Sequence, residues 1–281
     1  MIATGAHKYI FPFLIFLLLS VPSFAFKVEI TPQNVFPGDV FLAQIQSDEP
    51  DTIEATFRGE QIIFSHGESG LLIALVPVDI NTPPKKYSIS ITEGGKKQSA
   101  SVVVNPSTFK TINLTLPEGK VTLSPENQKR VEKEYILQKK IWSKSTGRSW
   151  QGQFMQPLDT EISTEFGVKR IMNKKKTSIH RGMDFRGKTG TPVKAVNSGT
   201  VVLSKDLFYG GNTLIVDHGM GLYSVYMHLS GFNVTEGKKV DNGQIIGFVG
   251  SSGRATGPHL HLSVKLNGIS VNPESLFRLA L

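Results

Sequence analysis

The chain has 281 residues, 39% hydrophobic and 19% charged, which is typical of soluble globular proteins, allows two domains and excludes global disorder. It contains no cysteine, which excludes disulfides, thiolate metal ligands, a cysteine nucleophile and a lipidated cysteine. The net charge of +8 suits either nucleic acid or the anionic polymers and membranes of a cell envelope.

Residues 1–25 are predicted to be a secretory signal peptide. Lys8 gives a short basic start, an apolar stretch runs from about residue 10 to 19, and residues 23–25 form a small-x-small cleavage pattern. A retained membrane anchor is the alternative, but the apolar stretch is well short of the ~20 residues that span a bilayer. We therefore expect an exported chain, periplasmic or secreted, with no stable membrane span after signal cleavage.

The basic residues do not resemble a nucleic-acid site. They are spread in short groups such as Lys174–Lys176 and Lys238–Lys239, without the aromatic stacking residues of a single-strand binder. We expect no nucleic-acid partner, and in an exported protein the positive charge favours anionic envelope polymers.

Residues 26–105 alternate short β-rich runs, such as 40–45 and 71–75, with turn residues such as Pro37-Gly38. Strands at this spacing predict a small antiparallel β-sandwich of immunoglobulin-like type. The one histidine of this segment, His66, falls in a turn, and we expect it at the surface.

Residues 106–155 are more polar and are predicted to be a linker with a helix. Ser124 can cap the first backbone N–H groups, and Pro125 is tolerated at the first helical position, so a helix should run from about residue 125 to 142. We interpret it as a spacer helix that lies on the next domain.

Residues 156–281 return to short β-rich runs separated by glycine turns, with no long helical period. They predict a C-terminal domain of mostly antiparallel sheet. The fold class is therefore mainly β: a sandwich, a helical linker and a second β domain.

Five of the chain's seven histidines lie between positions 180 and 261. His180 precedes Asp184 by four residues, and His259 precedes His261 by two, so in extended chain each pair can project from one face. His228 lies between the two groups.

Imidazole nitrogen and carboxylate oxygen are good zinc donors, and three protein ligands leave a fourth position for water. Zinc lowers the pKa of bound water to about 7 and polarises a carbonyl, so such a site can hydrolyse a peptide bond. On spacing alone, a pair of strand histidines that is merely hydrogen-bonded remains the alternative.

The surroundings of these residues resemble the lysostaphin-like, or LytM-type, zinc metallopeptidases over about residues 157–273. The matching segments are ISTEFG at 162–167, HRGMDF at 180–185, GTPVKA at 190–195, VDHG at 216–219, YMHL at 226–229 and GSSGRATGPHLH at 250–261. The last segment is the most specific of them.

This resemblance implies that His180, Asp184 and His261 bind one zinc ion (Zn2+), with His228 and His259 beside it. The latter two would activate the water or stabilise the oxyanion and leaving group; which of them is the base stays open. The implied activity is an endopeptidase for peptidoglycan, acting on stem or cross-bridge peptides for cell-wall remodelling. No protein partner is indicated.

Other residues of the matching region are less specific. Asn212 and Tyr226 are candidates to line the groove and contact substrate amides, with plain packing as the alternative, and His218 is expected to be structural or at the surface. After His261 the chain reads Leu262-Ser263-Val264, where many relatives place an aromatic and an acidic residue. If that acid normally orients a ligand, the residues around the metal site differ here.

Two other functions compete with the enzyme. One is a catalytically inactive relative that binds the wall or activates an amidase, and the other is a wall-binding module in which the front sandwich is the functional part. Inactive members of the family typically lose metal ligands, whereas all three positions are filled here. The front sandwich is expected to position the peptidase or to cover its groove.

Overall fold

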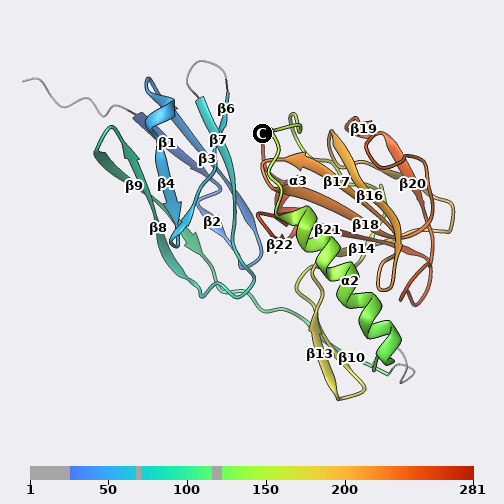
Figure 1. Ribbon diagram of the computed structural model, residues 1–281. Helices are drawn as coiled ribbons and strands as arrows, with labels where there is room; N and C mark the ends of the chain where they lie inside the picture. The colour runs from blue at the N-terminus through green and yellow to red at the C-terminus, as the bar shows by residue number, and fades with distance from the viewer. Residues whose placement is uncertain (1–25, 68–70, 116–121) are drawn as a thin grey trace, which may run out of the picture.

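The computed structural model describes residues 26–67, 71–115 and 122–281. The predicted signal peptide lies outside these residues. They form two β-rich units joined by a connection that contains one long helix (Figure 1). Within the described residues, no helix combines the length and apolar character needed to cross a membrane.

The first unit consists of two sheets around one core. One sheet contains β1 (Phe26–Thr31), β3 (Val40–Ser47), β7 (Leu71–Pro77) and β6 (Ser65–His66), in that order. The other contains β2 (Asn34–Val35), β9 (Lys96–Val104), β8 (Lys85–Glu93), β4 (Glu54–Phe57) and β5 (Glu60–Gln61), and a 3-10 turn, η1, spans Pro50–Thr52.

Alternation along the strands explains why two layers form. In β8, Ile89 and Ile91 are buried whereas Ser88 and Ser90 are exposed, so one face is apolar and packs on the other sheet. The mainly β class is confirmed, and the two layers form a sandwich; its immunoglobulin-like type stays a prediction. His66 is exposed in β6, where it faces Asp51.

The connection contains a strand that the sequence did not predict. β10 (Thr111–Leu114) pairs in parallel with β12 (Lys169–Met172), which pairs antiparallel with β13 (Lys176–Ile179). The segment around 171–178 is thus part of a β-hairpin to which the linker adds a third strand. The domain boundaries near 105 and 155 stay predictions.

The helix of the connection is α2 (Pro125–Trp142), close to its predicted bounds. Ser124 caps it by accepting the Asn127 N–H at 3.2 Å. Ile141 joins a small apolar cluster with residues of the second unit, and the Tyr223 hydroxyl donates to the Ile141 carbonyl at 3.0 Å. The helix therefore lies on the second unit (Figure 1), which agrees with its interpretation as a spacer helix packed on the next domain.

The second unit is a 10-stranded sheet in which every pairing is antiparallel. Its main path is β11 (Ile162–Thr164), β14 (Met183–Arg186), β21 (His259–Leu266), β18 (Leu222–Phe232), β17 (Gly211–Gly219), β16 (Gly199–Leu207) and β19 (Lys239–Val240). Beside it lie β15 (Pro192–Lys194), β20 (Ile245–Val249), β22 (Ile269–Val271) and the short helix α3 (Pro273–Phe277).

The two units share a hydrophobic core. Val40 and Leu42 of the sandwich belong to the same buried cluster as Phe166 and Leu276 of the second unit. The Asn272 N–H, just before α3, donates to the Gly38 carbonyl at 2.7 Å. Burial of apolar surface across this contact fixes the sandwich against the sheet that carries the candidate site.

Candidate metal centre

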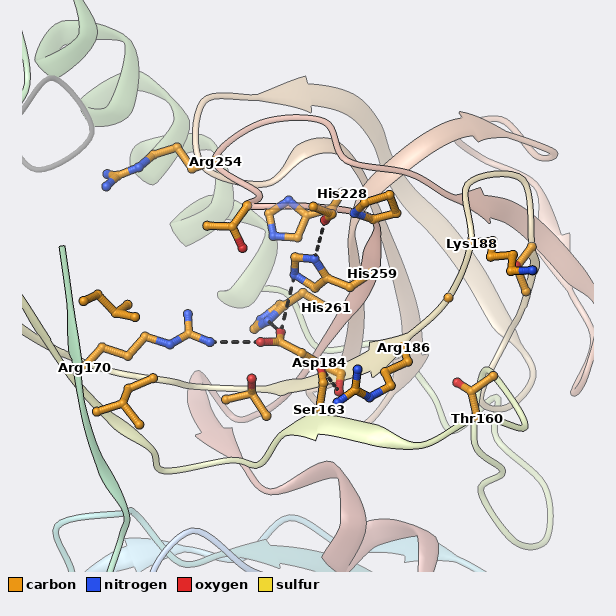
Figure 2. A pocket seen from close by; sticks show the side chains of 18 residues that line it. Thr160, Ser163, Arg170, Asp184, Arg186, Lys188, His228, Arg254, His259 and His261 are labelled. Carbon is orange, nitrogen blue, oxygen red and sulfur yellow. Dashed lines mark hydrogen bonds and ion pairs between the residues drawn. The ribbon is translucent and has the colours of Figure 1, made fainter. Parts of the chain in front are cut away.

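Three side chains converge on one point between β14 and β21. The Asp184 Oδ1 atom lies 3.0 Å from His180 Nε2 and 2.7 Å from His261 Nδ1, and the two nitrogens are 3.0 Å apart. His180 and Asp184 are only 3% and 6% exposed. Within the described ranges, these three form the group of donors close enough to share a metal ion. Figure 2 shows two of them, Asp184 and His261, side by side.

Strand register brings the three together. Asp184 of β14 is the direct cross-strand partner of His261 of β21, and side chains opposite each other in an antiparallel pair lie on the same face. Gly182 leaves the necessary space, because a Cβ atom there would lie 2.6 Å from His261 Nε2. Of the residues expected to point into one cleft, Asp184, His259 and His261 line it, and His180 contacts Asp184 from outside the described lining.

Hydrogen bonds on the far side of each ring decide which nitrogen faces the cluster. His180 Nδ1 lies 2.8 Å from the Glu165 carbonyl, which can only accept, so Nδ1 carries hydrogen and Nε2 offers its lone pair. His261 Nε2 lies 2.8 Å from Ser263 Oγ, and that hydroxyl donates its own hydrogen to the Arg181 carbonyl at 2.9 Å. His261 Nε2 must therefore donate, which leaves the Nδ1 lone pair directed at Asp184.

The donor set fits a divalent cation. Two imidazole lone pairs and one carboxylate oxygen at these separations repel one another unless positive charge lies between them, and zinc accepts this combination of ligands. Burial lowers the pKa of His261 and so favours its neutral form.

Two further histidines stand beside the cluster. His228 Nδ1 lies 2.9 Å from the Ser252 carbonyl, and His259 Nδ1 lies 2.8 Å from the Gly257 carbonyl, so in the neutral rings both Nε2 atoms are free to accept a proton. The ring centroids are 4.8 Å apart, and His259 Nε2 lies 3.8 Å from Asp184 Oδ1. Burial lowers the pKa of His228 to about 4.

The cluster lies in a cleft of about 820 Å3 whose described lining is strongly basic. Arg186 and Lys188 lie on one side of the histidines in Figure 2, and Arg170 and Arg254 lie on the other. Asp184 supplies the acidic group among the described lining residues. The cleft therefore presents positive charge on both sides of the candidate metal site.

Residues 178–273 match peptidase family M23. The chain carries a peptidase family M23 domain. This confirms the resemblance to the lysostaphin-like peptidases that the sequence motifs indicated.

Curated relatives and a solved structure agree with this assignment. The chain is 40% identical over 117 residues to the DD-carboxypeptidase/endopeptidase Mpg of Neisseria meningitidis serogroup B, covering 42% of this chain and 27% of that one. It is 37% identical over 142 residues to the peptidoglycan DD-endopeptidase ShyA of Vibrio cholerae, covering 49% of this chain and 33% of that one. The match thus spans a third or less of these relatives' length.

A crystal structure assigned to peptidase M23 from Pseudomonas aeruginosa extends the likeness beyond this domain. It superposes with a TM-score of 0.65 at 29% identity and covers 86% of this chain and 94% of that chain. The similarity therefore includes residues outside the M23 domain as well as the domain itself.

Two expected groove residues lie elsewhere in the M23 domain. Tyr226 is fully buried, and its hydroxyl accepts the Val196 N–H at 2.9 Å and lies 3.0 Å from Ser224 Oγ. This corrects the expectation of a substrate contact, because the ring packs in the core. The Asn212 side chain donates to the Leu229 carbonyl at 3.0 Å, and the described lining of the cleft does not include it.

His218 is buried, with Nδ1 2.7 Å from the Ser198 carbonyl, so of the two expected roles it has the structural one. Its place is therefore inside the fold, away from the cleft lining.

Two residues that contact the candidate ligands were not predicted from the sequence. Ser263 orients His261, and it occupies the position where many relatives have an acidic residue. Its two-residue spacing from His261 on a strand could have indicated that the two side chains share a face. Arg170 donates to Asp184 Oδ2 at 2.9 Å. No local pattern identifies Arg170, because the contact joins a separate hairpin to β14.

Proposed function

We propose that the chain is a zinc-dependent endopeptidase that hydrolyses peptide bonds in peptidoglycan stem or cross-bridge peptides. The observation that carries this proposal is the convergence of three donor atoms, His180 Nε2, Asp184 Oδ1 and His261 Nδ1, in a basic cleft of an M23 domain. Relatives described as a peptidoglycan DD-endopeptidase and a glycyl-glycine endopeptidase support both the reaction and the polymer.

These three atoms would hold one zinc ion. When bound, zinc lowers the pKa of a coordinated water to about 7 and polarises a carbonyl oxygen. The protein supplies the ligand orientation, because Glu165 and Ser263 fix the hydrogen on the far nitrogen of each histidine.

His228 and His259 would move protons. Each has its Nδ1 hydrogen directed at a backbone carbonyl, so Nε2 can accept a proton from water and return it to the leaving amine. An imidazolium formed beside the cluster would also stabilise the negative charge of the tetrahedral intermediate.

The charge of the cleft favours peptides that carry carboxylates. Arg186, Lys188 and Arg254 line it, and an anionic stem peptide gains attraction that a neutral glycine bridge does not. The sequence left stem and cross-bridge peptides open as substrates. We therefore place a stem-peptide link that carries carboxylates, such as D-alanine to diaminopimelate, ahead of a glycine-rich cross-bridge. Such a substrate is met outside the cytoplasm, so the proposal includes export to the periplasm or the exterior.

The competing proposal is a wall-binding protein or amidase activator without catalysis. Digestion of purified sacculi of known bridge chemistry, with mass spectrometry of the released fragments, separates the two. We expect cleaved stem peptides from the wild-type chain and none from His261→Ala. A zinc-loaded wild-type chain that binds sacculi but releases no fragment would establish the non-catalytic alternative.

A further inference from the structure

The two oxygens of Asp184 have different partners. Oδ1 faces His180 and His261. Oδ2 accepts a hydrogen bond from the Arg170 guanidinium at 2.9 Å (Figure 2). The Asp184 side chain is 8% exposed and that of Arg170 28% exposed, so the pair is largely shielded from water. The guanidinium therefore fixes which oxygen of Asp184 is directed at the histidines.

Arg170 is itself held between two neighbouring strands. It lies in β12 opposite Ile112 of β10 and opposite Ser178 of β13. The ends of β10 are tied to β12 by the bonds from the Lys169 N–H to Lys110 and from the Asn173 N–H to Leu114, each 2.8 Å. The strand contributed by the linker thus prevents β12 from moving away from the cleft.

The chain just before Arg170 also supports a second ligand. The Glu165 carbonyl accepts from His180 Nδ1, and the His180 N–H donates to the Val168 carbonyl at 2.8 Å. Between them, Gly167 adopts φ +85°, and the Phe109 ring occupies the space that a Cβ atom would need. One segment, packed on the linker, therefore fixes the positions of both His180 and Arg170.

We propose that Arg170 is a positioning residue that orients Asp184 for metal binding; this inference rests on the metal site of the proposed function. Two effects of the guanidinium oppose each other. Its positive charge reduces the attraction of Asp184 for a dication, whereas its hydrogen bond keeps Oδ1 directed at the histidines. Orientation dominates, because without Arg170 the buried Oδ2 loses its partner and the carboxylate can rotate away from the cluster.

Zinc affinity tests this directly. The dissociation constant is measured by competition with a chromophoric chelator on the full chain, for wild type, Arg170→Met, Arg170→Lys and Arg130→Met. Arg130 is the matched control, because its guanidinium also binds a carboxylate, that of Asp206 at 2.8 Å, away from the cleft. We expect Arg170→Met to weaken zinc binding about 10–100-fold, Arg170→Lys to lie in between and Arg130→Met to match wild type.

Two further readouts separate positioning from a structural defect. The absorption spectrum of the Co2+-loaded chain reports ligand geometry, and we expect it to change in Arg170→Met and to be largely restored in Arg170→Lys. Circular dichroism of the metal-free variants checks folding. If Arg170→Met does not fold, the zinc affinity of Arg170→Lys tests the positioning role instead, because lysine retains the charge and loses the planar guanidinium.

The outcomes are distinct. Zinc binding by Arg170→Met that equals or exceeds wild type would overturn the positioning role, because the charge effect would then dominate. Wild-type affinity in a folded Arg170→Lys, where that variant decides, would overturn it as well. A wild-type chain that binds no zinc would instead refute the metal site of the proposed function.

Discussion

Replacement of Ser263 by alanine tests how the His261 ring is oriented. The Ser263 hydroxyl accepts from His261 Nε2 at 2.8 Å and donates to the Arg181 carbonyl at 2.9 Å, and the residue is 8% exposed. Alanine at this position leaves both the His261 Nε2–H and the Arg181 carbonyl without their hydrogen bond to the hydroxyl. A buried polar group without a partner costs about 1–3 kcal/mol, so we expect the free energy of unfolding of the metal-free chain to fall by that order.

The effect on metal binding follows from the tautomer. Without the hydroxyl, the hydrogen of His261 is no longer held on Nε2, and the Nδ1 lone pair directed at Asp184 is lost in the other tautomer. Loss of such a partner typically weakens metal affinity about 10–100-fold, equivalent to roughly 1.4–2.7 kcal/mol. Zinc competition titration and thermal unfolding with and without zinc measure the two effects separately.

Ser270→Ala is the matched control for this experiment. Ser270 is also buried, at 5% exposed, and its hydroxyl accepts from Lys265 Nζ at 3.0 Å, but it lies in β22 away from the cluster. It should lower stability without changing zinc affinity. If Ser263→Ala retained wild-type zinc affinity, the argument that this hydroxyl selects the ligating nitrogen would be wrong.

Three other predictions follow from the same geometry. His180→Ala and His261→Ala should each abolish zinc retention and peptidoglycan hydrolysis together, measured by bound metal and fragment release, because two protein ligands hold zinc poorly; activity surviving either change would contradict the site. Burial lowers the pKa of His218 from 6.5 to about 4. Between pH 6.5 and pH 4 the imidazole is therefore protonated in the unfolded chain but neutral in the folded one. The free energy of unfolding therefore falls by at most about 3 kcal/mol on account of this residue as the pH is lowered from 6.5 towards 4. Urea titrations at a series of pH values should show a smaller fall in His218→Gln than in wild type. Lys188→Gln and Arg254→Gln should raise KM for anionic stem peptides with little change in kcat, and added salt should shrink the difference; equal KM values at low salt would count against charge selection.

Strand alternation is a local rule, so the sequence could show which candidate residues share a face, whereas their role as ligands was implied by the family resemblance. Asp184 and His261 lie on the same face of paired strands, and the two-residue spacing of His259 and His261 places both at the cleft. The capped start of α2 at Ser124 is equally local and was also predicted. In each case a few neighbouring residues determine the conformation.

Contacts between distant segments could not be predicted in this way. β10 has four residues, and its parallel partner β12 lies more than fifty positions further along the chain, so no spacing within the linker reveals the pairing. Arg170 reaches Asp184 only because that pairing and the β12–β13 hairpin exist. The positioning role of Arg170 therefore depends on tertiary contacts, which the polar sequence of the linker does not indicate.

Tyr226 shows how alternation can mislead when a strand is irregular. Tyr226, a candidate for the groove, is two residues from His228, a spacing that places both on one face of a regular strand. In β18, however, Tyr226 pairs with the buried Leu262, while Met227 pairs with His261. Strict alternation would therefore turn His228 towards the core as well.

His228 reaches the cleft because its backbone departs from the strand. It adopts φ +64°, a left-handed conformation that is uncommon outside glycine, and its N–H donates to the Gly210 carbonyl at 2.7 Å. Nearby, the pairing of β18 with β20 shifts register between Leu229 and Gly231. A regular strand would bury this imidazole beside Tyr226, so the strained backbone is what brings His228, for which we propose proton transfer, into the cleft lining. Such strain is concentrated at functional sites.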